Sequence, residues 1–150
     1  MSARRLAVLA ALTALVACSD LHLNPASSFI QTPIADPSFA FDIMPVLSQT
    51  CATSHACHLA PPDTTRPDFE NDSIAYAQLV NHPTHTPFAS AAYPRVKPGF
   101  ADSSFFWLVL HDTASIRLGY PYRMPLTRYA LPFPTTETIK NWINMGAKNN

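Results

Sequence analysis

Charge and glycine are both scarce in this chain. Only 13% of its 150 residues are charged, about half of the roughly 25% usual in a soluble domain, and ten basic side chains balance ten acidic ones. With no net charge and no Lys/Arg cluster, the chain lacks the features of a nucleic-acid-binding protein. Three glycines leave little for a phosphate-binding loop, and no Ser-His-Asp context or His-Glu-x-x-His motif indicates hydrolytic chemistry.

Long hydrophobic runs and internal repeats are missing as well. The apolar stretch near the start, Leu6 to Val16, has eleven residues, whereas a membrane-spanning helix needs about 20. The absence of a repeat excludes a solenoid, and the length allows one domain or one small domain with a tail. An apolar fraction of 47% predicts a folded core, while fifteen prolines predict long loops.

The first residues predict a secretion signal. Arg4 and Arg5 precede the apolar stretch, as in a signal peptide. The stretch ends in Leu-Val-Ala-Cys18, which resembles the lipobox of bacterial lipoproteins. The resemblance implies removal of residues 1–17 and acylation of Cys18, and Ser19 after the cysteine implies an outer-membrane lipoprotein with its domain in the periplasm or on the cell surface. The alternative is an ordinary secretory signal that leaves Cys18 as a thiol.

The remaining chain divides into a tether and a domain. Residues 18–38 are polar and interrupted by prolines, which predicts a lipid-anchored flexible tether, and the domain is expected over residues 39–150. Cys51 and Cys57 are then the two unlipidated cysteines, in an oxidising compartment.

About four short helices with long irregular loops are expected, which makes the domain mainly α. The expected helices are Phe39 to Thr50, Asn71 to Val80, Asp102 to Leu110 and Thr135 to Met145. Their expected capping and end signals are Asp42 with Pro45 in the first turn, Asn71 or Ser73, Thr135, and Gly146. By periodicity alone the apolar run Phe105 to Leu110 could be a buried strand, but the preceding Ala-Asp-Ser-Ser favours a helix.

The pair of cysteines is followed by a histidine, which indicates a covalent cofactor. A c-type haem is held by two thioethers to cysteines, and the histidine directly after the second cysteine ligates the iron. Cys51, Cys57 and His58 supply these groups. Met124 is the candidate for the opposite axial position because its soft thioether suits iron(II), and Arg123 is a candidate partner for a haem propionate.

An ordered series of motifs resembles small class I cytochrome c domains, particularly the planctomycete-type domains of bacterial cell-envelope proteins. The motifs are Ile-Met-Pro-Val-Leu, Cys-Ala-Thr-Ser-His-Ala-Cys-His, Tyr-Ala-Gln-Leu-Val, Val-Lys-Pro-Gly with Asp-Ser-Ser-Phe-Phe, Arg-Met-Pro, and Ile-Lys-Asn-Trp-Ile-Asn-Met-Gly-Ala. The resemblance implies one covalent haem c on Cys51 and Cys57, with His58 and Met124 as axial ligands.

The resemblance also implies the packing around the cofactor. Phe106 and Trp142 would lie near the macrocycle, and the N-terminal helix, Ile43–Thr50, would cross the C-terminal one, Thr136–Met145.

The cysteine spacing departs from the family. Five residues separate the cysteines where the standard motif has two, so the extra residues would have to bulge outward, and a single thioether through Cys57 is an open variant. A disulfide between Cys51 and Cys57 is the plain alternative, and a zinc site would have to use Cys51, His55, Cys57 and His58. Should Met124 not ligate, the spare imidazoles are those of His55, His82, His85 and His111.

The sequence therefore predicts a lipid-anchored monohaem protein that transfers single electrons to redox proteins not identified by the sequence. It is expected to be a carrier rather than an enzyme, because His/Met ligation closes the sixth position of the iron. One alternative is a haem-free module with a Cys51–Cys57 disulfide that acts in binding or assembly at the envelope. Another is a haem sensor or peroxidase-like protein in which Met124 is displaced.

Overall fold

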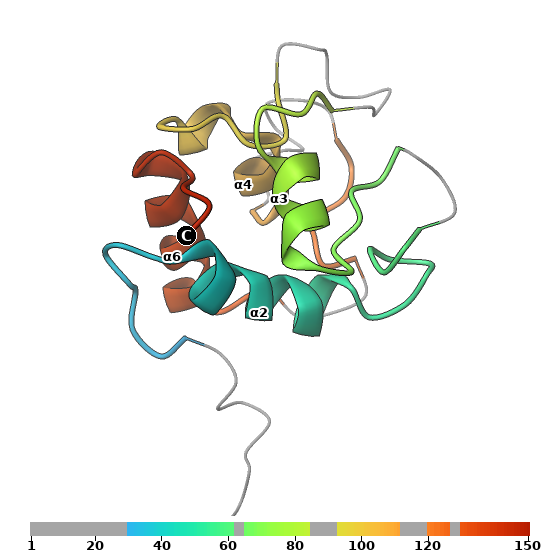
Figure 1. The fold of residues 1–150 in the computed structure, drawn as a ribbon, viewed down its shortest axis with the longest axis horizontal. Helices are drawn as coiled ribbons and strands as arrows, with labels where there is room; N and C mark the ends of the chain where they lie inside the picture. The colour runs from blue at the N-terminus through green and yellow to red at the C-terminus, as the bar shows by residue number, and fades with distance from the viewer. Residues whose placement is uncertain (1–29, 62–64, 85–92, 112–119, 127–129) are drawn as a thin grey trace, which may run out of the picture.

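The computed structural model describes residues 30–61, 65–84, 93–111, 120–126 and 130–150, and in these it is mainly helical (Figure 1). The elements are η2 (Phe39–Ile43), α2 (Met44–Val46), η3 (Leu47–Cys51), α3 (Asp72–Leu79), η4 (Ala101–Ser103), α4 (Phe105–Val109) and α6 (Phe133–Asn144). Within the described ranges no strand is formed, only two isolated bridges, Val80 with Val96 and Pro83 with Pro94. The expected mainly-α class is confirmed.

The first helical segment joins η2, α2 and η3 without a break. Ser38 is its N-cap: its hydroxyl accepts from the Phe41 N–H at 3.3 Å, and its own N–H donates to Asp42 Oδ2 at 2.8 Å. The prediction of Asp42 as the cap is therefore wrong, because Asp42 is the partner of the cap. Pro45 lies in the first turn of α2, but the continuous helical segment begins earlier, at Phe39.

Two further helices follow the expected pattern with corrected bounds. Asn71 caps α3, since its side chain accepts from the Ile74 N–H at 3.1 Å. The apolar run that could have been a strand forms the helix α4, as predicted. It is separated from η4 by Ser104, whose backbone is extended and whose hydroxyl accepts from the Lys97 N–H at 2.8 Å. That bond holds the chain at the break, which periodicity does not reveal.

The C-terminal helix α6 begins at Phe133, two residues before the expected cap. Pro134 fits its first turn, and the Thr136 N–H donates to the Pro132 carbonyl at 3.1 Å. Thr135 is thus inside the helix, and the prediction that it caps is wrong. The predicted stop is confirmed: Gly146 adopts a φ of 100°, and the next N–H, that of Ala147, donates back to the Trp142 carbonyl at 2.8 Å.

The core is centred where η2, α3 and α6 meet. Phe39 is fully buried, and its ring lies 5.2 Å from the ring of Trp142 on α6 and 5.2 Å from that of Tyr76 on α3. The C-terminal helix therefore packs against the first helical segment, although the family resemblance implies a crossing over Ile43–Thr50. The ring contacts lie at the start of that segment, on η2.

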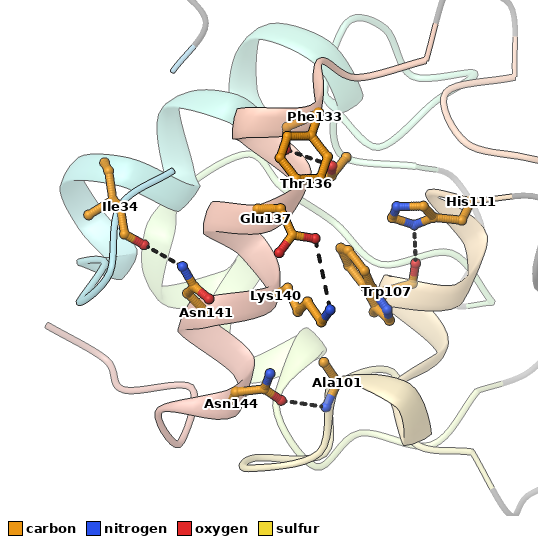
Figure 2. A network of polar contacts seen from close by, with 10 residues as sticks. All are labelled: Ile34, Ala101, Trp107, His111, Phe133, Thr136, Glu137, Lys140, Asn141 and Asn144. Atoms are coloured by element: carbon orange, nitrogen blue, oxygen red, sulfur yellow. Dashed lines mark hydrogen bonds and ion pairs between the residues drawn. The ribbon is translucent and has the colours of Figure 1, made fainter. Parts of the chain in front are cut away.

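Helix α4 packs against α6 on another side (Figure 2). The Lys140 Nζ lies 5.4 Å from the centre of the Trp107 ring and 3.9 Å from a Glu137 oxygen. At the end of α6, Asn144 Oδ1 accepts from the Ala101 N–H at 3.0 Å. These contacts fix α4, which contributes part of the wall of the cavity described below.

The described residues before Phe39 already contact the helices. The Ile34 N–H donates to Thr138 Oγ1 at 2.9 Å, the Asn141 side chain donates to the Ile34 carbonyl at 2.8 Å, and Pro37 is fully buried. The predicted tether and domain boundary remain predictions, but Ile34 is hydrogen-bonded to α6. The predicted signal peptide and Cys18 lie outside the described residues. In the described part of the chain no helix is long and apolar enough to cross a membrane.

Candidate functional site

One cavity of about 480 Å³ brings the sequence-predicted site residues together. Cys51, Cys57, His58 and Met124 all line it, although Met124 comes from a segment far along the chain. The rest of the wall is mostly apolar or aromatic and includes Phe69, Leu79, Phe105, Phe106, Val109, Leu110, Tyr120 and Leu126. Its volume falls within the roughly 300–1,000 Å³ of small-molecule and cofactor sites.

The cysteine loop closes on itself despite its length. The His58 N–H donates to the Cys51 carbonyl at 3.2 Å, and the Cys57 N–H donates to the Ser54 carbonyl at 2.9 Å. His55, in the middle of the loop, is exposed. The loop is thus exposed at His55, while both cysteines and two of the five intervening residues line the cavity.

Cys51 and Cys57 carry separate thiols rather than a disulfide in the structure. Burial raises the pKa of the Cys51 thiol from its ordinary value, outweighing the Thr50 hydroxyl at 3.4 Å, which lowers it; nearby Cys57 raises it further. The Cys57 sulfur receives hydroxyl hydrogen bonds from Thr53 at 3.6 Å and Ser54 at 3.4 Å. Cys51 is therefore a neutral thiol at neutral pH, held at the end of η3.

His58 is oriented through its Nδ1 atom. This nitrogen lies 2.8 Å from the Pro67 carbonyl oxygen, which can only accept, so Nδ1 carries the proton and Nε2 carries the lone pair of the neutral ring. The ring also stacks on Phe69 with 4.9 Å between centroids and 27° between planes. Metal-ligating histidines generally donate their other ring N–H to such a second group, which fixes tautomer and orientation. The arrangement suits His58 to ligate a metal through Nε2.

Met124 reaches the cavity from residues 120–126. It is half-buried, and its backbone N–H donates to the Val109 carbonyl at the end of α4 at 2.7 Å. Tyr122 and Leu126 also line the cavity and are 53% and 60% exposed, so this wall extends to the protein surface.

The arginines are arranged differently from the expectation. Arg123 is exposed and does not line the cavity, whereas Arg66 and Arg95 do. Sequence reasoning missed both wall arginines and Pro67. The only signal for Arg95 is a cation next to the apolar Val96 in a chain with few charges.

The other predicted residues separate into wall and core. Phe106 lines the cavity, while Trp142 packs on Phe39 in the core and its indole N–H donates to the Lys148 carbonyl at 2.9 Å. Burial raises the pKa of Tyr120 on the wall, and neighbouring Tyr122 raises it further.

Among the described histidines, only His58 lines the cavity. His55, His82 and His111 each contact a backbone carbonyl through Nδ1, at Ala60, Pro83 and Trp107 respectively. His85 lies outside the described residues. In the residues that the structure describes, no group of three or more His, Cys, Asp or Glu side chains is arranged to hold a metal ion.

Two thiols, one oriented imidazole and one thioether thus face a single apolar cavity, an arrangement that could hold a planar metal-bearing ligand covalently and axially. No family model, no curated protein and no solved structure gives a significant match to this chain.

Proposed function

We propose that this chain is a cytochrome c-like electron carrier that holds one haem covalently in the cavity. Cys51 and Cys57 would bear the thioethers, and His58 and Met124 would be the axial ligands. A single observation carries the proposal: four residues of the required types, from two distant parts of the chain, line the same apolar cavity.

The residues present fit the group in two independent respects. The Pro67 carbonyl fixes the His58 tautomer in which Nε2 is the ligating atom, as expected for an axial histidine. The wall around it is largely apolar and aromatic, which suits a porphyrin face and restricts water. When bound, the haem would supply an iron that alternates between two oxidation states, and His/Met ligation would raise its reduction potential.

The fold proposed with this function is the class I cytochrome c fold. It is supported by the packing of α6 against the first helical segment and by the cysteine loop directly after η3. The exposed Tyr122 and Leu126 beside Met124 provide a surface where a redox partner can approach the cavity. The lipid anchor at Cys18, the outer-membrane location and the absence of enzymatic turnover belong to the same proposal.

The haem-free alternative differs in the state of the two cysteines. A disulfide between Cys51 and Cys57 would leave the cavity without covalent attachment, and the chain would act in binding or assembly. In the structure the two cysteines are separate thiols, so neither covalent state is formed.

The deciding experiment is a spectrum of the denatured polypeptide. The full chain is exported through its own leader in a host with c-type haem maturation, denatured, and extracted with acidified organic solvent. We expect the alkaline pyridine spectrum of the polypeptide to contain retained haem, with a band position that distinguishes two thioethers from one. Cys51→Ser should leave one thioether and Cys51→Ser/Cys57→Ser none, whereas Ser48→Ala, an exposed control, should match the native chain. A colourless polypeptide without reactive thiols would overturn the proposal in favour of the disulfide module.

A further inference from the structure

Arg95 is a buried cation on the wall of the cavity. Its side chain is only 4% exposed, and its burial lowers the pKa of the guanidinium. Nη1 donates to the Gln78 carbonyl at 3.0 Å and Nη2 donates to the Thr65 carbonyl at 3.0 Å. Both acceptors are neutral, so neither balances the charge.

Within the part of the chain that the structure describes, no carboxylate lies within ion-pair distance of Arg95. The ion pairs between described residues are formed by Lys140 with Glu137 and by Lys148 with Asp36, at other places in the fold. A buried charge without a counter-charge is costly, and buried charges in proteins are generally paired. The guanidinium has five N–H donors, and the two carbonyls use only part of this set.

The position of Arg95 is fixed by the backbone around it. Its own N–H donates to the His82 carbonyl at 2.7 Å, and its carbonyl accepts from the Phe106 N–H at 2.8 Å. Two hydrogen bonds from the guanidinium and two from the backbone of Arg95 thus hold this residue in place on the wall of the cavity. A preorganised fork of this kind matches the geometry of a carboxylate.

We propose that Arg95 binds a carboxylate of the ligand in the cavity, and that for a haem this group is a propionate. The proposal rests on the function proposed above, and it replaces the expected role of Arg123. The residue would act in binding and orientation, because the paired carboxylate fixes which edge of the ligand faces Arg95.

The test compares an acid with its ester in the whole, haem-free chain, made in a host without c-type haem maturation. The probes are iron-free mesoporphyrin and its dimethyl ester, which have no vinyl groups to react with the thiols, and binding is followed by fluorescence. We expect the native chain to prefer the diacid by about tenfold or more, since a charge-assisted hydrogen bond contributes roughly 1.5–3 kcal/mol. Arg95→Gln should abolish this preference, Arg95→Lys should keep part of it, and Arg123→Gln, the matched exposed control, should keep all of it.

The outcomes separate the two proposals. If Arg95→Gln binds the ester as tightly as the native chain does, the variant is folded. The loss of its preference for the diacid is then due to the lost contact between Arg95 and the carboxylate. Equal affinity of the native chain for both probes, or a preference that persists in Arg95→Gln, would overturn the role of Arg95 while leaving the porphyrin site intact. Failure of the native chain to bind either probe would overturn both the site and the role of Arg95.

Discussion

Met124 is the residue whose replacement separates iron ligation from packing. If its sulfur ligates the iron, Met124→Ala should remove any sulfur–iron absorption band near the red edge and lower the reduction potential, while the covalent haem stays. Met145→Ala is the matched control, because Met145 is 45% exposed and does not line the cavity. Optical spectra and redox titration measure both effects. A band that persists in Met124→Ala would assign the axial position to another residue.

Cys51 makes the stability of the haem-free chain depend on pH in the alkaline range. Its pKa is raised in the folded state above the ordinary 9.0, so the stability that it contributes is complete below about pH 9 and is lost as pH rises through the folded pKa. Tyr120, whose pKa is also raised, adds a contribution of the same sign. We expect the free energy of unfolding, measured in urea, to decrease as the pH rises above 9. In the Cys51→Ala variant this decrease should be less steep. An equal slope in both chains would contradict the burial of this thiol.

Thr135 and Thr138 lie within one turn of helix α6, and their buried hydroxyl groups differ in hydrogen bonding. Both are buried, but the Thr135 hydroxyl has no hydrogen-bond partner among the described residues, whereas Thr138 Oγ1 donates to the Pro134 carbonyl at 2.9 Å and accepts from Ile34. An orphaned buried hydroxyl costs free energy, so Thr135→Val should raise the free energy of unfolding by about 1 kcal/mol. Thr138→Val should lower it by roughly 1–3 kcal/mol. Thermal unfolding of both variants checks the pair, and destabilisation by Thr135→Val would mean that its hydroxyl is satisfied.

The helices were largely predictable from the sequence because their signals are local. The Asn71 cap and the Gly146 stop act within one turn, and both are confirmed. The predictions of caps at Asp42 and Thr135 are wrong because the helices begin earlier, after Ser38 in the first segment and after Pro132 in α6. The break at Ser104 depends on a hydrogen bond to Lys97, seven residues away, which no helical period encodes.

The residues of the cavity were predictable only in part, because only some of them are marked by local sequence signals. The cysteines and His58 form a contiguous motif, and Met124 lies in a recognisable Arg-Met-Pro, so these could be named from sequence. The Pro67 carbonyl is a backbone group, and Arg95 is placed on the wall by hydrogen bonds to residues distant in sequence, such as that of its N–H with the His82 carbonyl. Tertiary contacts of this kind leave almost no trace in composition or spacing.

The whole molecule should depend on the ligand for part of its core. The cavity of about 480 Å³ lies against the hydrophobic core, since buried core residues such as Phe69, Phe106 and Leu110 line it. We expect the native chain made without haem maturation to melt roughly 10 °C or more below the haem-bearing protein, because an attached haem would be buried in the cavity and ligated by His58 and Met124 only in the folded state. Differential scanning calorimetry on both forms measures the difference. Equal melting temperatures would mean that the cavity is structurally independent of its ligand.

The hydrogen bond from the His58 N–H to the Cys51 carbonyl also bears on the order of biogenesis. It closes a short segment, so both thiols and the imidazole can approach one another while the rest of the chain is still extended, at small entropic cost. Met124 and α4 must arrive from far along the chain, a slower event. If a haem is attached here, its attachment could therefore precede folding, because the eight-residue stretch 51–58 carries both thiols and the imidazole, and the later arrival of the Met124 thioether would complete the site.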